Sequence, residues 1–253
     1  MYKINFDRLW IRGDTHGDFS WLAAFCEENQ TTHDDAIIIT GDHGFLYYGS
    51  NNWREKNIKK AAAKCKITII CLRGNHDDRP QNRVNEMLFS EIESDPIVPS
   101  GYYWEPDYPH IWYVADGSVI TINDKRFLFI GGSASVDKEW RLLMGWRYFK
   151  DEELTREEFC NILDKIDHRY FDYVITHTCP EAWMPTDLFM KGVDQSKISR
   201  QTEEFLTTVS EIIDFNEWWF GHFHDDRFNM DIEQTHAGQG RVYMIYNEIV
   251  KLI

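Results

Sequence analysis

Eight side chains with oxygen or nitrogen donor atoms follow directly after short apolar runs of this sequence. They are two carboxylates, one amide and five imidazoles, at Asp14, Asp42, Asn75, His16, His76, His177, His222 and His224. Oxygen and imidazole donors of this kind suit divalent manganese, iron or zinc. The sequence contains no CxxC pair, which argues against a closed structural zinc site. The donor types therefore predict a site for divalent metal ions.

Each fragment that carries these donors has an ordinary structural explanation when it is taken alone. "DTH" at 14–16 suits a turn with a surface histidine, and "GD" at 41–42 suits a helix cap or a turn. "GNHD" at 74–77 also suits a turn, and His177 alone suits a core histidine. "GHFH" at 221–224 is harder to explain by packing. The prediction therefore depends on the fragments occurring together.

The elements that must position these donors alternate between short apolar runs and amphipathic segments, which is typical of an α/β domain. Strands are predicted over 9–12, 36–40, 67–73, 127–130, 173–176 and 217–220, and helices over 18–29, 53–64, 155–166 and 199–213. Thr155 and Glu158 have the spacing of a capping box. The proline-containing stretch 94–109 and the segment 133–153 are predicted to be irregular. Because ligands of open α/β sheets bind beyond the carboxyl ends of the strands, we expect the donors to converge there.

Composition excludes several classes of function. The formal net charge of -15 disfavours wide contact with a phosphate backbone, so no extended nucleic acid is expected as a partner. No apolar stretch reaches the roughly 20 residues of a membrane span, so no membrane partner is expected. The five cysteines form no motif and the first residues show no secretory apolar region, which predicts reduced thiols and a cytoplasmic location. No linker or repeat divides the 253 residues.

In order, the fragments read Asp-x-His, Gly-Asp, Gly-Asn-His-Asp, a lone histidine and Gly-His-x-His, extending from Asp14 to His224. This order resembles the signature of the calcineurin-like metallophosphoesterase superfamily. The resemblance implies one domain over 1–253 with an α/β fold: a four-layer αββα sandwich of two mixed β-sheets flanked by helices, with a binuclear metal site at the carboxyl ends of the strands. The chain is similar to bacterial or prophage-type members and departs from the protein Ser/Thr phosphatase branch, since it has "GDHGFLYYG" and "GNHD" where that branch has "GDxxDRG" and "GNHE".

The resemblance also implies a role for each donor. The ligands of one divalent ion would be Asp14, His16, Asp42 and His224. The ligands of the other would be Asp42, Asn75, His177 and His222, so that Asp42 bridges the two ions, which are Mn, Fe or Zn. His76 is similar to the family's catalytic histidine, which contacts the phosphate and gives a proton to the leaving group.

The implied activity is that of a phosphoric ester hydrolase, in which a metal-bridging hydroxide attacks phosphorus directly and no phosphoenzyme forms. We favour a phosphatase that acts on a phosphorylated small molecule or nucleotide. A phosphodiesterase or nuclease on the same site is the first alternative. A non-catalytic interaction scaffold that retains the fold is the second alternative, from a different class of function.

Three features carry no role from the resemblance. The arginine that follows "GD" in the protein phosphatases is absent, so a phosphate clamp must come from elsewhere, and Arg12, Arg73 and Arg79 are candidates. Asp77 either orients His76 or caps a turn. The segment 133–153 is a candidate for gating the substrate, with ordinary packing as the alternative for its aromatic residues. Its charged and aromatic residues are Asp137, Lys138, Trp140, Arg141, Trp146, Arg147 and Tyr148.

Overall fold

The computed structural model of the chain describes residues 4–83, 85–95, 98–166, 168–230 and 240–253. Its larger sheet contains, in spatial order, β12 (Val250–Lys251), β1 (Arg8–Arg12), β2 (Asp35–Ile39), β3 (Thr68–Cys71), β6 (Tyr108–Val114), β5 (Val98–Glu105) and β4 (Leu88–Asp95). Its smaller sheet contains β11 (Arg241–Met244), β10 (Asp214–Phe220), β9 (Tyr170–Thr176), β8 (Lys125–Ile130) and β7 (Ser118–Ile122). In the larger sheet parallel pairs form the centre and antiparallel pairs both margins. In the smaller sheet every pair is parallel except β7 with β8, so both sheets are mixed.

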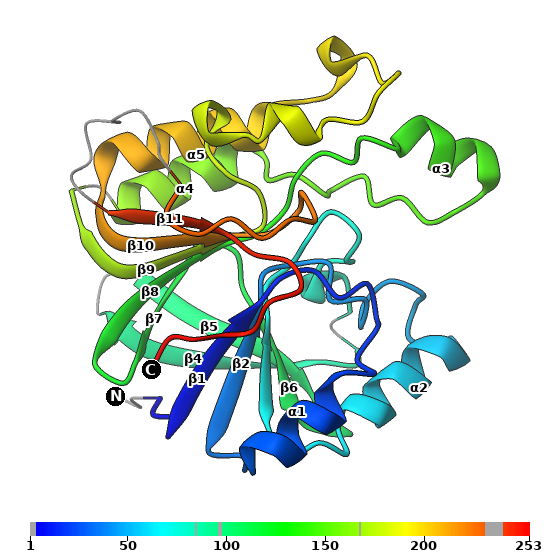
Figure 1. The fold of residues 1–253 in the computed structure, drawn as a ribbon, viewed down its shortest axis with the longest axis vertical. Coiled ribbons are helices and arrows are strands. Elements are labelled where there is room, and N and C mark those ends of the chain that lie inside the picture. The colour runs from blue at the N-terminus through cyan, green and yellow to red at the C-terminus, as the bar shows by residue number, and fades with distance from the viewer. Residues whose placement is uncertain (1–3, 84, 96–97, 167, 231–239) are drawn as a thin grey trace.

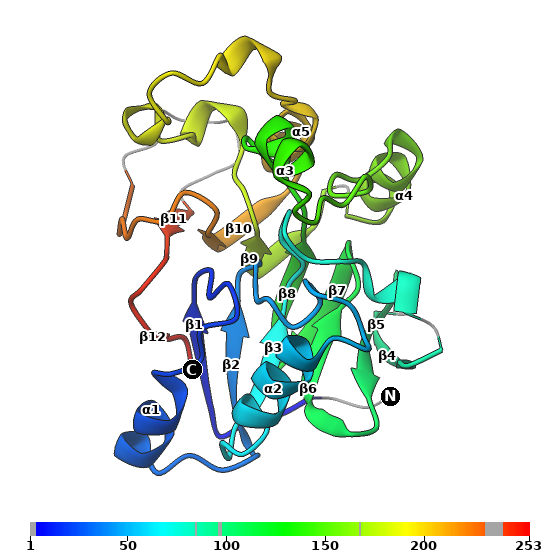
Figure 2. The ribbon, with the colours of Figure 1, turned by 90° about the vertical axis from the view of Figure 1, so that its right-hand side faces the viewer.

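The two sheets pack face to face, and helices cover their outer faces (Figure 1, Figure 2). Alternation along β1 shows why: Leu9 and Ile11 lie in the core between the sheets, whereas Trp10 lies in the core under the helices. The larger sheet is covered by α1 (Leu22–Asn29) and α2 (Trp53–Ala62), and the smaller by α4 (Arg156–Ile166) and α5 (Gln201–Ile212). Strands buried on both faces read as continuous apolar runs. The predicted four-layer sandwich is confirmed.

Most of the predicted elements are confirmed, and two stretches differ. The capping box forms at α4, since the Thr155 backbone N–H donates to Glu158 Oε2 at 2.7 Å and the Glu158 N–H donates to Thr155 Oγ1 at 3.2 Å. The prediction that 94–109 is irregular is wrong, because β4, β5 and β6 form antiparallel pairs there. Pro106 lies in the turn between β5 and β6, where its missing N–H costs no sheet hydrogen bond. Pro96 lies outside the described residues.

The segment 133–153 is irregular apart from one short helix, α3 (Lys138–Met144), which the sequence prediction missed. Figure 1 shows α3 standing out from the layers at the end of a long connection. Short 3-10 helices occupy other connections, at Pro80–Arg83, Glu181–Trp183, Thr186–Leu188 and Gln195–Lys197. Within the described part of the chain, no helix combines the length and apolar character that crossing a membrane requires.

Candidate metal centre

The eight predicted donors lie together at the carboxyl ends of the central strands. Asp14, Asp42 and Asn75 follow β1, β2 and β3 of the larger sheet. His177 follows β9 and His222 follows β10 of the smaller sheet, so the two sheets meet at one cluster. Ligand atoms within 4.8 Å of one another define two groups, Asp14 with His16 and His224, and Asp14 with Asp42 and His177. Hydrogen bonds connect Asn75, His76 and His222 to these groups.

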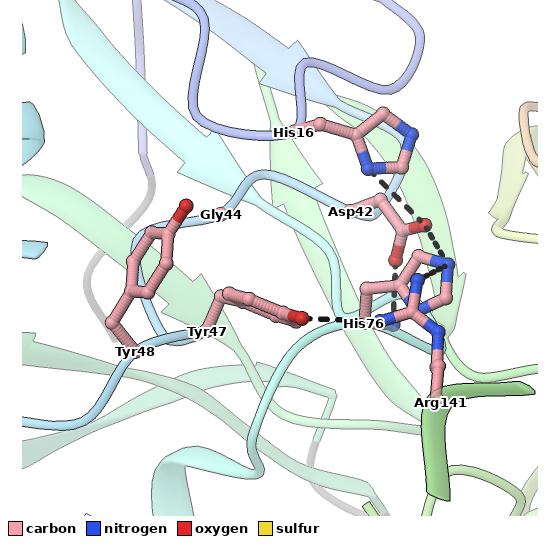
Figure 3. A pocket seen from close by; sticks show the side chains of 7 residues that line it. All are labelled: His16, Asp42, Gly44, Tyr47, Tyr48, His76 and Arg141. Atoms are coloured by element: carbon pink, nitrogen blue, oxygen red, sulfur yellow. Dashed lines mark hydrogen bonds and ion pairs between the residues drawn. The ribbon is translucent and has the colours of Figure 1, made fainter. Parts of the chain in front are cut away.

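Asp42 presents its two oxygens to different donors. Oδ1 lies 3.7 Å from His177 Nε2. Oδ2 lies 3.9 Å from His16 Nδ1 (Figure 3). The carboxylate is buried, and burial alone raises its pKa. The neighbouring His76, His177 and His16 outweigh that effect, so the pKa of Asp42 falls well below its ordinary value. Asp42 therefore stays ionised and faces both groups of donors.

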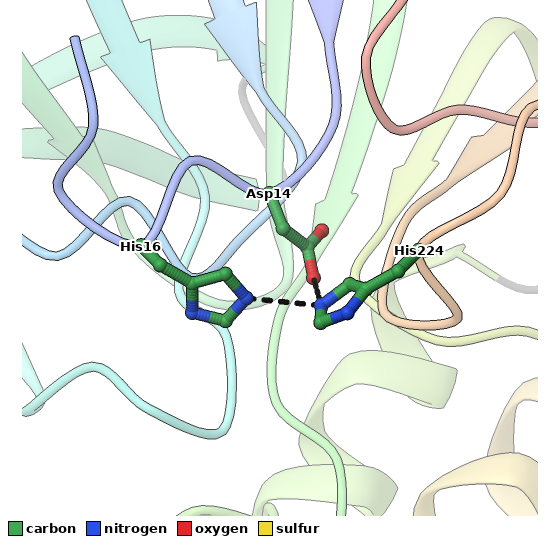
Figure 4. Close-up of side chains that lie close together, drawn as sticks. All are labelled: Asp14, His16 and His224. Atoms are coloured by element: carbon green, nitrogen blue, oxygen red, sulfur yellow. Dashed lines mark hydrogen bonds and ion pairs between the residues drawn. The ribbon is translucent and has the colours of Figure 1, made fainter.

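His16 and His224 reach toward each other beside Asp14 (Figure 4). Their Nε2 atoms are 2.9 Å apart, and His224 Nε2 is 3.3 Å from Asp14 Oδ2. The hydrogen bond with Asp14 raises the pKa of His224. Burial raises the pKa of Asp14, whereas His177 and the hydrogen bond from His224 lower it. The lowering effects are larger, so the pKa of Asp14 lies below its ordinary value. One carboxylate oxygen and two ring nitrogens thus converge on one region.

The local backbone is unusual at several of these donors. His16, Asp42, His222 and His224 have φ angles of 46°, 46°, 68° and 55°. These values lie in the left-handed region, which non-glycine residues adopt rarely and at a cost of about 1–3 kcal/mol each. Glycine is required beside the donors, because a Cβ on Gly74 would collide with the Asp42 carboxylate. The backbone is held in strained conformations where the donors converge.

The donor set fits divalent cations for a reason that is visible in its hydrogen bonds. His177 Nδ1 lies 2.9 Å from the Thr40 carbonyl oxygen, which can only accept, so the ring donates from Nδ1. In the neutral ring Nε2 then carries a lone pair, and it lies 2.9 Å from another acceptor, Asn75 Oδ1. Two acceptors at that distance repel each other unless a proton or a cation lies beside them. A divalent ion would also offset the two buried carboxylates, Asp14 and Asp42.

A pocket of about 190 Å³ opens beside this cluster (Figure 3). Its lining residues are His16, Asp42, Gly44, Tyr47, Tyr48, His76 and Arg141. The backbone N–H of His76 donates to Asp42 Oδ1 at 2.8 Å, and burial lowers the pKa of its ring. Sequence reasoning missed Tyr47 and Tyr48, because two tyrosines in a connection carry no catalytic pattern. Arg141 was recognised only as one of several residues in 133–153.

Arg141 is the arginine that reaches this pocket. Its Nη2 lies 2.9 Å from His76 Nε2, and because a guanidinium can only donate, Nε2 accepts. Nε donates to Asp137 Oδ1 at 2.7 Å and Nη1 to Tyr47 Oη at 3.1 Å. The guanidinium is therefore fixed from three sides, and α3 is tied to the site through it.

The other candidate residues have different partners. Arg73 pairs with Asp116 at 2.9 Å, and Arg79 pairs with Glu158 at 2.6 Å. Arg12 donates to the Asn247 carbonyl oxygen. None of these three arginines lines the pocket.

Asp77 caps a turn. Its carboxylate accepts backbone N–H groups from Gly74 and Gly44, each at 3.0 Å, and from His43 at 3.2 Å. These bonds hold the loop after β3 against the loop after β2, and so keep Asn75 and Asp42 side by side. Of the two roles considered for Asp77, the contacts support the turn-capping one.

Comparison with known proteins gives three findings. A model of the calcineurin-like phosphoesterase family matches residues 8–226, a range that includes every predicted donor. The crystal structure of TT1561 of Thermus thermophilus is similar at 11% sequence identity and a TM-score of 0.45, with 95% of this chain and 89% of that chain covered. Among curated proteins, no sequence matches this chain.

Proposed function

The chain belongs to the calcineurin-like phosphoesterase family, and from this premise we propose that it is a phosphatase for a phosphorylated small molecule or nucleotide. Membership supports metal-dependent hydrolysis of phosphate esters in general. The observation that carries the narrower proposal is the pocket of about 190 Å³, which places His76 and Arg141 beside the Asp42 carboxylate. That volume is below the roughly 300–1,000 Å³ of most ligand pockets, which favours a compact phosphoryl group.

Two groups of side chains would hold the metal ions in this proposal. Asp14, His16 and His224 would bind one ion, and Asn75, His177 and His222 would bind the other. Asp42 would bind both ions. Divalent ions bound there would hold the phosphoryl oxygens, neutralise charge in the transition state and make water acidic enough to act as a nucleophile at neutral pH. The left-handed φ angles and the turn cap of Asp77 keep the donors in place before substrate arrives.

His76 and Arg141 would act on the phosphate and the leaving group. Arg141 donates to Nε2 of His76, so this nitrogen carries no proton in the present arrangement. A phosphate oxygen that accepts from Arg141 would compete for that donor and release Nε2. His76 would then take up a proton from solvent water at Nε2 and pass it to the departing alkoxide. Arg141 would therefore be the arginine that binds the phosphate. Arg12, Arg73 and Arg79 have other partners and do not line the pocket.

A paired assay tests the proposal. With added Mn²⁺, the protein is expected to hydrolyse nitrophenyl phosphate faster than bis-nitrophenyl phosphate and to bind two Mn²⁺ per chain. A chelator should abolish the activity and fresh Mn²⁺ should restore it, because the activation of water and the neutralisation of charge both depend on the ions. Faster hydrolysis of the diester would favour the phosphodiesterase or nuclease. Two bound ions without hydrolysis of either ester would favour the interaction scaffold.

The role of Arg141 predicts a loss of activity without a loss of metal. A hydrogen bond to a charged group contributes about 1.5–3 kcal/mol, so Arg141→Ala should lower kcat/KM for the monoester by about 10- to 150-fold. Tyr47→Phe removes only the hydroxyl that accepts from Arg141 and should cost less.

Arg156→Ala is the matched control, since it removes the same charge from an exposed position at the start of α4. Both the metal content and kcat/KM should be unchanged in this protein. An Arg141→Ala protein that keeps its kcat/KM, or that loses its metal, would contradict the phosphate clamp.

A further inference from the structure

Two serines in the connection that follows β8 link donors of the metal centre to buried glutamates. Ser135 Oγ lies 2.6 Å from Glu152 Oε2 and 2.9 Å from Asn75 Nδ2. Ser133 Oγ lies 3.2 Å from Glu203 Oε1 and 3.3 Å from His222 Nε2. The exposed fractions of the four intermediaries are 1%, 4%, 5% and 2% for Ser133, Ser135, Glu152 and Glu203. Water therefore has little access to replace either connection.

The connection at Ser135 fixes the orientation of an amide. Both oxygens of Glu152 face Ser135, because Oε1 accepts its backbone N–H at 3.0 Å and Oε2 accepts its hydroxyl. Burial raises the pKa of Glu152 to about 7. Above that pH the carboxylate is ionised, so the single hydroxyl proton is committed to Oε2 and Oγ can only accept from its remaining neighbour. Asn75 must then present Nδ2 to Ser135. Its Oδ1 is turned the other way, to within 2.9 Å of His177 Nε2.

The connection at Ser133 fixes the position of a ring proton in the same manner. Glu203 Oε1 accepts from Ser133 Oγ and also from Thr178 Oγ1 at 2.9 Å. With its proton committed to Glu203, Ser133 accepts from Nε2 of His222. A neutral imidazole has one ring proton. That proton lies on Nε2, which leaves the lone pair of Nδ1 for a cation.

We infer that Glu152 and Glu203 are positioning residues, which act through Ser135 and Ser133 to set the amide orientation of Asn75 and the tautomer of His222. This inference rests on the proposed metal centre, because it assigns Asn75 and His222 to the same ion. Substituting a residue that hydrogen-bonds to a metal ligand and orients it commonly lowers the metal affinity by about 10- to 100-fold. The two serines share one connection, so one short segment tunes two ligands of that ion.

Glu152→Gln tests the inference because it changes the direction of one hydrogen bond at nearly constant shape. The Gln Oε1 would keep the backbone N–H of Ser135, which leaves its amide nitrogen to donate to Ser135 Oγ. The hydroxyl proton of Ser135 would then point to Asn75 and favour the flipped amide. We expect Mn²⁺ titrated into metal-free protein to bind about 10- to 100-fold more weakly at one site and unchanged at the other. The measurement is the binding isotherm, so it does not depend on activity.

Two further variants complete the test. Glu157→Gln removes the same charge from an exposed position on α4 and should leave both affinities unchanged. Ser135→Ala removes the connection without reversing it, so its loss should be smaller than that of Glu152→Gln. Thermal unfolding of the metal-free proteins shows whether each variant folds, and Ser135→Ala alone carries the test if Glu152→Gln does not fold.

The outcomes distinguish failure of the positioning role from failure of the proposed metal centre. Wild-type protein that binds fewer than two Mn²⁺ would overturn the metal centre itself. Wild-type protein that binds two, together with a folded Glu152→Gln protein of unchanged affinity, would overturn the positioning role alone. A loss in Ser135→Ala that exceeds the loss in Glu152→Gln would also overturn it, because the direction of the hydrogen bond would then be irrelevant.

Discussion

Replacing Asp42 by Asn is expected to remove metal from both groups of donors, whereas His177→Ala is expected to empty mainly one. The reason is that Asp42 faces His16 with one oxygen and His177 with the other. The substitution removes one negative charge that attracts both ions. The ions together contribute several kcal/mol of charge stabilisation, so the rate should fall by about 10³-fold or more.

Metal content per folded chain is the measurement that distinguishes the two variants. After equilibration with Mn²⁺ and removal of the excess, Asp42→Asn should retain much less metal than His177→Ala. Asp164→Asn is the matched control, because it makes the same change at an exposed position on α4. Equal losses from Asp42→Asn and His177→Ala would show that Asp42 does not serve both ions.

His76→Ala should leave the metal content intact and lower turnover by about 10²- to 10⁴-fold on an alkyl phosphate. An alkoxide needs a proton as its bond to phosphorus breaks, whereas a nitrophenolate leaves without one. The loss on nitrophenyl phosphate should therefore be smaller than the loss on the alkyl ester. The ratio of the two losses, measured as kcat on both substrates, isolates proton donation from general damage to the pocket.

The control for this prediction is His33→Ala, which removes an exposed imidazole at the opposite end of β2 from Asp42. Equal losses on both esters, with metal retained, would mean that His76 binds phosphate without acting as the acid. Loss of metal would instead make His76 a ligand or a support for one. Arg141→Ala gives a useful comparison, since its effect should depend little on the leaving group.

The donors could be predicted from the sequence because each stands where an apolar run ends. Parallel strands bring such positions to one edge, so Asp14, Asn75 and His177 converge although they are far apart in the chain. The strands from β4 to β6 were not predicted because their prolines and polar residues interrupt the alternation of apolar and polar residues that identifies a strand. Prolines at turns and strand ends are compatible with a sheet, which composition alone does not show.

The residues that contact the donors without being donors themselves could not be predicted from the sequence. Ser135 and Glu152 are common residue types whose role depends on one contact of 2.6 Å across 17 positions of an irregular segment. Arg141 reaches His76 from a helix that the local sequence did not reveal. Tyr47 likewise meets Arg141 across 94 positions of the chain. Such pairings arise from tertiary packing, which leaves no periodic trace in the sequence.

The hydrogen bond from the His222 backbone N–H to Asp14, which spans 208 positions of the chain, has a consequence for how the molecule folds. Asp14 follows a strand of the larger sheet and His222 follows a strand of the smaller, and the last strand, β12, pairs with the first, β1. Contacts of such sequence separation form late, because the entropy of closing the chain must be lost first. During synthesis the first donors emerge long before their partners. If the proposed metal centre binds its ions as described, it would become complete only when the two sheets dock, and metal uptake would then mark the completed fold.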